Sequence, residues 1–101
     1  MKKQLLIIAT LDTKGREAAY VRDCVHQLGV NSIMMDVGTL EKPLANPDIT
    51  SNEVAEAAGY NLDQLEAKRD RTNAVKAMQV GGAILAKKLV EDGKIETSCA
   101  D

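Results

Sequence analysis

The sequence predicts an α/β protein, a Rossmann-like three-layer fragment with a short parallel sheet and flanking helices. An unbroken apolar run within residues 4–10 is typical of a strand buried on both faces of a parallel sheet. The apolar spacing then changes to that of a surface helix from about Arg16 to Leu28, with charged residues on the opposite face. A second apolar stretch at about residues 32–37 completes a strand–helix–strand unit, and such units are parallel and right-handed.

Length and composition limit the function classes. The 101 residues, 45% of them hydrophobic, fit one soluble globular domain. The 13 basic and 15 acidic residues are interspersed, so we expect neither nucleic acid nor a membrane surface as a partner. No apolar run has the length of a signal peptide or a membrane span, which predicts a cytoplasmic location. Cys24 and Cys99 make neither a disulfide framework nor a metal cluster.

The hexapeptide Thr10–Gly15 links the first strand to the helix and is the predicted ligand site. Such a turn has unpaired N–H groups and the positive end of the helix dipole, which favour an anion such as phosphate. Thr10 and Thr13 offer hydroxyls, and Lys14 offers a cation. Gly15 allows a ligand to approach the backbone, and Asp12 can hold a magnesium ion or a ribose. A purely structural interpretation stays open, in which Asp12 or Thr13 is the N-cap of the helix.

The end of the second strand lies beside this turn in a right-handed unit. Asp36 stands there, about 20 residues past Gly15, at the spacing of a ribose-binding acid in dinucleotide folds. Gly38 follows it in a turn. The alternative interpretation is that Asp36 only caps the turn at Gly38 and Thr39.

Turn and cap signatures predict the next elements. Prolines and turn residues place residues 39–47 in a loop that is long enough to cover a site. Thr50 and Glu53 form a capping-box signature that opens a short helix, and Gly59 ends it.

A short helical turn and a long helix complete the chain's helical part. The short turn begins at Asn61 or Asp63, and Asp70 is placed to cap a helix over Arg71–Glu91. The pair Gly81–Gly82 costs helix propensity, so it is expected to allow the close approach of a neighbouring helix or strand. The side chains expected to be buried on the long helix are Val75, Met78, Ile84, Leu85 and Leu89.

Only two strands are predicted, because the chain turns polar at Thr97 after a strand-like start at residues 94–96. A two-stranded parallel sheet is rarely stable alone. Residues 1–101 are therefore expected to form a single truncated domain whose first strand is an apolar edge that a second copy covers. This predicts a homodimer or larger oligomer. The alternative is that helices make the contact through Gly81–Gly82, while the carboxyl-terminal tail from Lys94 to Asp101 covers the edge of the first strand.

Five motifs that follow one another along the chain carry a family resemblance. They are Thr10-Leu-Asp-Thr-Lys-Gly15, Asp36-Val-Gly38, Pro47-Asp-Ile49, Glu53-Val-Ala-Glu-Ala-Ala-Gly59 and Asp70-Arg71. Over about residues 4–96 they resemble the amino-terminal part of the ATP-binding domain family named after the tomato mosaic virus resistance protein. Members of that family continue into a glycine-rich, phosphate-binding loop where this chain has residues 97–101.

The resemblance implies a nucleotide-binding fragment of a larger Rossmann-like domain, with ATP and Mg²⁺ as ligands and Asp12 at the metal. The residues implied for the nucleotide site are Thr10, Asp12, Thr13, Lys14, Gly15, Asp36, Gly38 and Arg71. No residue is assigned a catalytic role, because one histidine and two cysteines form no nucleophile–base pair here. The alternative function is a non-catalytic structural or protein-interaction subunit that has lost the complete nucleotide site.

Overall fold

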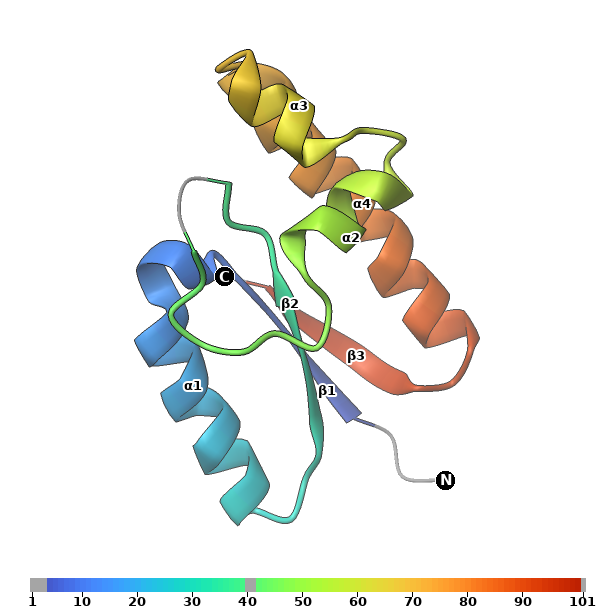
Figure 1. The fold of residues 1–101 in the computed structure, drawn as a ribbon. Helices are drawn as coiled ribbons and strands as arrows, with labels where there is room; N and C mark the ends of the chain where they lie inside the picture. Colours follow the sequence, from blue (N-terminus) through green and yellow to red (C-terminus); the bar gives the residue numbers. More distant parts are fainter. Residues whose placement is uncertain (1–3, 40–41, 101) are drawn as a thin grey trace.

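The described part of the chain folds into three parallel strands and four helices (Figure 1). The computed structural model describes residues 4–39 and 42–100, and the side chains of residues 96–100 are outside that description. The elements are β1 Gln4–Ala9, α1 Leu11–Gln27, β2 Ser32–Asp36, α2 Ser51–Ala57, α3 Leu62–Ala67, α4 Arg71–Glu91 and β3 Ile95–Ala100. None of the four helices in this part of the chain has an apolar stretch of the length that spanning a bilayer requires.

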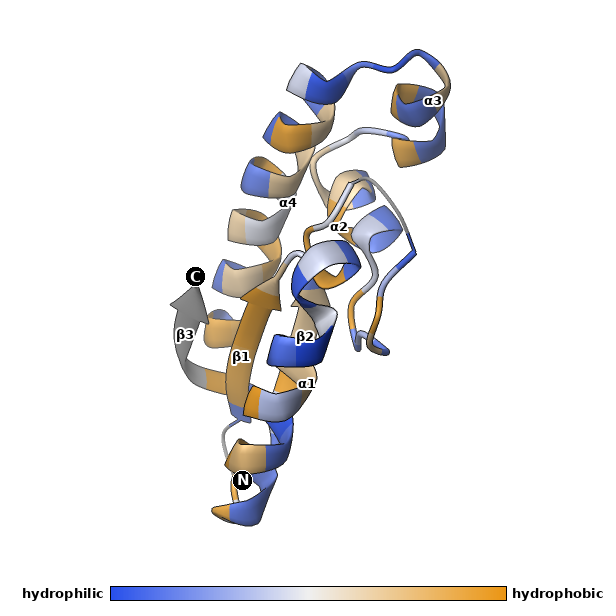
Figure 2. Ribbon diagram, turned by 90° about the vertical axis from the view of Figure 1, so that its left-hand side faces the viewer, coloured by the Kyte–Doolittle hydropathy of each residue, from blue (hydrophilic) through white to orange (hydrophobic). Residues whose placement is uncertain are grey.

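The predicted strand–helix–strand unit is confirmed. β1 pairs in parallel with β2, in a register that runs from Leu5 opposite Ser32 to Ala9 opposite Asp36. Figure 2 shows β1 as a continuously hydrophobic strand, as expected of the centre of a sheet covered on both faces.

Helices cover both faces of the sheet, which gives the predicted three layers. Because successive side chains of a strand point to opposite faces, β1 contributes to two cores. Leu6 packs in the core beneath α2 and α4, and Ile7 packs in the core beneath α1. Figure 1 shows α1 on one side of the sheet and α2 with α4 on the other.

The prediction that the third strand is missing is wrong, and the alternative, that the carboxyl-terminal tail covers the edge of the first strand, is confirmed for the residues of β3. β3 pairs in parallel with β1, with Gln4 opposite Ile95 and Leu6 opposite Ser98, and an irregularity between the two. Parallel pairing uses backbone N–H and C=O groups, which polar residues supply as well as apolar ones. The strand order is therefore β2-β1-β3, and β1 is the central strand rather than an open edge. The last residue of the predicted polar tail, Asp101, is outside the described residues.

Helix α1 begins five residues earlier than the predicted start at Arg16, since its first helical residue is Leu11. Lys14 has non-helical dihedral angles, φ −114° and ψ 15°, so this first turn joins the rest of α1 across a kink. The side chain of Leu11 is completely buried, and that burial holds the extra turn against the sheet. Helix propensity alone does not favour a helix across Thr13 and Gly15, and the packing of Leu11 against the sheet overrides this propensity.

The short helices form where the cap signatures predicted them. The Thr50 hydroxyl accepts a hydrogen bond from the Glu53 N–H at 3.2 Å, and the Glu53 carboxylate accepts one from the Thr50 N–H at 3.1 Å. This is the reciprocal capping box at the start of α2. Asn61 caps α3 by accepting a hydrogen bond from the Gln64 N–H at 3.1 Å.

The bounds of α4 are confirmed, but its buried face is rotated from the predicted one. Asp70 caps the helix by accepting from the Asn73 N–H at 3.1 Å. Val75 and Ile84, predicted to be buried, are 50% and 46% exposed. The buried residues of α4 are Ala74, Ala77, Met78, Gly81 and Gly82, while Leu85 and Leu89 pack against the core and are partly buried.

Small residues set this rotation of α4, because they let α2 come close. A side chain at Gly81 would overlap the carbonyl oxygen of Val54 in α2. The predicted close approach at the glycine pair is therefore confirmed, and it occurs between α4 and α2 of the same chain. Gly81 is not available for a contact between two copies of the chain, which was the alternative route to a dimer.

Candidate functional site

The sheet order places a topological switch point at the carboxyl end of β1. The chain leaves β1 toward β2 on one side and later returns to β3 on the other side. In open parallel sheets, ligands bind in the crevice outside the carboxyl ends of the strands at such a point. The turn that begins at Thr10 follows directly after β1 at this edge.

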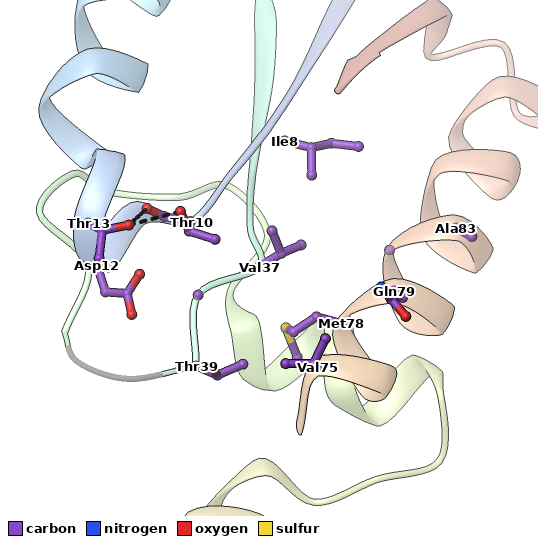
Figure 3. A pocket seen from close by; sticks show the side chains of 12 residues that line it. Ile8, Thr10, Asp12, Thr13, Val37, Thr39, Val75, Met78, Gln79 and Ala83 are labelled. Atoms are coloured by element: carbon purple, nitrogen blue, oxygen red, sulfur yellow. Dashed lines mark hydrogen bonds between the residues drawn. The ribbon is translucent and has the colours of Figure 1, made fainter. Parts of the chain in front are cut away.

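A pocket of about 420 Å³ lies at this edge, and we call it the switch pocket (Figure 3). Its lining residues are Ile8, Thr10, Asp12, Thr13, Val37, Gly38, Thr39, Val75, Met78, Gln79, Gly82 and Ala83. Figure 3 shows the polar Thr10–Thr13 turn on one side and residues of α4 on the other. The structure therefore brings together four of the eight predicted site residues, namely Thr10, Asp12, Thr13 and Gly38.

Sequence reasoning missed the α4 side of the switch pocket. Val75 and Met78 were expected only in the core, and Gln79 and Ala83 were given no role. Their position depends on how α4 packs across the strand ends, which no local pattern reports. The only local signal is Gly82, a small residue that keeps the helix backbone close to the pocket.

The polar side of the pocket is an ordered turn. The hydroxyls of Thr10 and Thr13 lie 3.0 Å apart, and the Thr13 hydroxyl also lies 3.3 Å from the Thr10 carbonyl oxygen. The N-cap position of α1 is Thr10, whose side chain makes no capping hydrogen bond. The interpretation of Asp12 or Thr13 as the N-cap is therefore wrong, because both residues lie within the first helical turn.

Asp36 joins the two turns that form the polar edge of the site. Its Oδ1 atom accepts hydrogen bonds from the Leu11 N–H at 3.1 Å and from the Gly38 N–H at 2.8 Å. The carboxyl group is almost completely buried and does not line the switch pocket. The turn-capping interpretation of Asp36 is confirmed, and the same oxygen also holds the start of α1.

Asp12 and Asp36 place two carboxyl groups around Gly38. A methyl group added at Gly38 would lie 2.5 Å from Asp12 Oδ1 and 3.1 Å from Asp36 Oδ1. Burial raises the pKa of Asp36 above its ordinary value of 3.8, and the negative charge of Asp12 raises this pKa further, against the two backbone hydrogen bonds that lower it. Glycine is thus the residue that fits between the two carboxyl groups.

The other predicted site residues lie elsewhere. Lys14 lines a separate cavity of about 440 Å³ beside α1, to which Thr10 also contributes. A side chain at Gly15 would lie 2.6 Å from the Cβ atom of Leu44, so the chain's own loop fills the space that was expected to admit a ligand. Arg71 lines a third cavity, between the end of α3 and the start of α4.

The described part of the 39–47 loop lies against α1, and the residues that follow it lie against β2. The Leu44 N–H donates to the Leu11 carbonyl oxygen at 2.8 Å, and Arg22 donates to the Asn46 carbonyl oxygen at 3.2 Å. Further on, Ile49 forms a bridge to Met35 of β2. Residues 40 and 41 are outside the described part of the chain. Among the described residues, no group of three or more His, Cys, Asp or Glu side chains is placed to hold a metal ion.

Comparison with known proteins gives a family match over nearly the whole chain. Residues 3–99 match the family described as "Uncharacterised protein family (UPF0261) N-terminal domain". A UPF0261 protein of Clostridium tetani (strain Massachusetts / E88) is 35% identical over 92 residues, which are 91% of this chain and 23% of the relative. A UPF0261 protein of Brucella suis biovar 1 (strain 1330) is 30% identical over 93 residues, 92% of this chain and 22% of the relative.

The chain thus spans less than a quarter of the length of these relatives. No solved structure matches it. The family description carries no ligand, so the ATP-binding label implied by the resemblance is a prediction beyond what these matches establish.

Proposed function

The chain belongs to the uncharacterised protein family UPF0261, as its N-terminal domain, and we propose that this domain binds a nucleotide such as ATP in the switch pocket. The observation that carries the proposal is the position of the Thr10–Thr13 turn, at one wall of a pocket at the switch point of a parallel sheet. A volume of about 420 Å³ is within the range of small-ligand pockets.

The two walls of the switch pocket suit the two ends of a nucleotide. The hydroxyls of Thr10 and Thr13 are donors for phosphate oxygens. On the opposite wall, Val75 and Met78 of α4 provide an apolar surface for a base. Lys14 lines the neighbouring cavity with Thr10, so it would add positive charge to phosphates that extend past Thr10.

Asp12 makes the proposed binding dependent on magnesium. A carboxylate repels a phosphate group about 5 Å away by roughly 3 kcal/mol at an effective dielectric constant of 20. A Mg²⁺ ion held by the Asp12 carboxylate would offset this repulsion, and at nucleotide sites magnesium is commonly bound by one or two carboxylates together with phosphates and water. Asp12 is therefore the proposed protein ligand of the metal, and the metal would arrive with the nucleotide.

Calorimetric titration of the purified chain with Mg-ATP tests this function. Thr13→Val keeps the shape of the side chain and removes its hydroxyl, so we expect binding about tenfold weaker, as for one lost hydrogen bond to a charged group. Chelation of magnesium with EDTA should abolish the heat. Thr72→Val is the matched control, because Thr72 is exposed and outside the switch pocket. The absence of heat with the unaltered chain at millimolar Mg-ATP would refute nucleotide binding.

The second candidate function is a non-catalytic interaction module that forms a homodimer or larger oligomer. The cavity beside α1 favours it, because apolar side chains of β1 and α1 such as Ile7, Ala18 and Val21 line it and Val21 is 43% exposed. We expect sedimentation velocity across a micromolar range to show a dimer that Val21→Asp dissociates. Val90→Asp, at an equally exposed position of α4, should have no effect. A compact monomer throughout that range would exclude this function.

A further inference from the structure

The third cavity, which Arg71 lines and which we call the arginine cavity, adjoins the switch pocket. It has a volume of about 300 Å³ and lies between the end of α3 and the start of α4. The lining combines basic, acidic and apolar residues, namely Arg69 and Arg71, Glu66 and Asp70, and Leu65 and Ala74. Thr39 lines both cavities, so a ligand in one would be next to a ligand in the other.

The backbone of Arg69 is unusual for its residue type. Its φ angle is +53°, in the left-handed region where a side chain costs energy and glycine does not. The other left-handed residues in the described chain are Gly29, Gly59 and Gly93, which follow α1, α2 and α4. The same helix-end position after α3 carries an arginine instead. This arginine lines the arginine cavity, and an observed left-handed outlier of this kind motivates a functional hypothesis for its side chain.

The charges around the cavity leave the two guanidinium groups available. Within the described residues, neither Arg69 nor Arg71 forms an ion pair or a side-chain hydrogen bond. Asp70 is the nearest acid along the chain, but its two oxygens accept from the N–H and the side-chain amide of Asn73, at 3.1 and 2.7 Å. Glu66 and Asp70 both line the cavity, so its lining has as many acids as arginines, and direct contact rather than long-range attraction must supply the affinity.

We propose that the arginine cavity is a second ligand site, which binds an oxyanion, phosphate or carboxylate, between Arg69 and Arg71. Guanidinium groups bind both oxyanions through paired N–H donors, and the Thr39 hydroxyl at the shared wall is a further donor. This goes beyond the proposed nucleotide site, because it assigns a different cavity to a second, anionic reactant or effector. Since Thr39 lines both cavities, the oxyanion would lie beside the contents of the switch pocket.

NMR titration of the full chain tests this proposal with inorganic phosphate and, separately, with succinate, at constant ionic strength. The Nε–H signals of Arg69 and Arg71 should shift and saturate with at least one of the two anions, and the anion that acts identifies the ligand class. Arg69→Gly should weaken this binding at least tenfold while it raises the melting temperature by about 4 °C, because it removes the left-handed strain. Glu66→Gln is the opposite control and should strengthen binding, because it removes a negative charge from the lining.

Saturable binding that Arg69→Gly abolishes supports the proposal, whether or not the chain binds Mg-ATP. Absence of saturable shifts with both anions would overturn it. Unchanged affinity in Arg69→Gly would also overturn the proposal. A lower melting temperature in this variant would overturn it too, because Arg69 would then stabilise the fold. If Arg69→Gly fails to fold, Arg71→Gln provides the same comparison from the other side of the cavity, since Arg71 is exposed and has helical dihedral angles.

Discussion

Replacing Gly81 with alanine should destabilise the fold by about 3 kcal/mol, whereas Gly82→Ala should stabilise it by up to about 1 kcal/mol. The two glycines are neighbours in the same helix, so their helix propensities are the same. Their surroundings differ. An alanine methyl at position 81 would overlap the Val54 carbonyl oxygen and lie 2.8 Å from the Val54 carbonyl carbon. A methyl at position 82 would lie 3.8 Å from its nearest neighbours in Met35 and Val37, which is ordinary contact.

The obstacle at Gly81 is backbone, which a rotamer change cannot remove. α2 must shift as a unit to accommodate Gly81→Ala, and the core formed with Val54 and Ala55 loosens with it. Urea unfolding of the two variants beside the unaltered chain measures both effects in one experiment. Equal stabilities for the two variants would mean that α2 and α4 are not in contact at Val54.

The sequence predicted the elements well where local chemistry decides them. Apolar runs identified β1 and β2, and the cap residues Thr50 and Asp70 identified the starts of α2 and α4, while Asn61 was one of the two starts predicted for α3. Errors arose where tertiary packing decides. The rotation of α4 follows from the fit of small residues against α2, and hydrophobic spacing alone does not report it.

β3 was missed for a related reason. A strand that adds to one side of a hydrophobic central strand gains its hydrogen bonds from the partner's backbone, so its own composition is a weak signal. The consequence is large, because β1 becomes the central strand and the expected open edge is filled. The premise for dimerisation through an open edge of β1 is therefore lost, and any self-association must use another surface, such as the cavity beside α1.

The candidate site was predicted in part, because adjacency along the chain and adjacency in space coincide only at the turn after β1. Thr10, Asp12 and Thr13 share one turn, and the right-handed crossover brings Gly38 beside them. Lys14 points elsewhere because α1 begins early and carries it to the cavity beside α1. The α4 wall of the pocket comes from more than 35 residues further along the chain, beyond the reach of a local pattern.

Asp36 accepts two backbone hydrogen bonds and also carries a buried carboxyl group that can be charged. Two replacements should separate the hydrogen-bonding role from the role of the charge. Asp36→Ala leaves the buried N–H groups of Leu11 and Gly38 without an acceptor, and each such loss costs about 1–3 kcal/mol. We therefore expect a loss of about 3 kcal/mol. Asp36→Asn keeps an oxygen in place for both donors and removes the negative charge beside Asp12, so its stability at neutral pH should equal or exceed that of the unaltered chain.

The pH dependence of the free energy of unfolding tests the role of the Asp36 charge. The sign of this dependence follows from the direction of the pKa shift. Burial raises the pKa of Asp36 in the folded chain above 3.8, so at intermediate pH the folded state holds a proton that the unfolded state has released. The stabilisation from this proton is complete below the unfolded pKa and is lost as the pH rises through the folded pKa. Asp36→Asn does not titrate, so its stability relative to the unaltered chain should increase as the pH rises from about 4 to 7. Urea unfolding of both chains at a series of pH values measures this difference. A difference that decreases with pH would mean that the hydrogen bonds from Leu11 and Gly38 outweigh burial and hold Asp36 ionised.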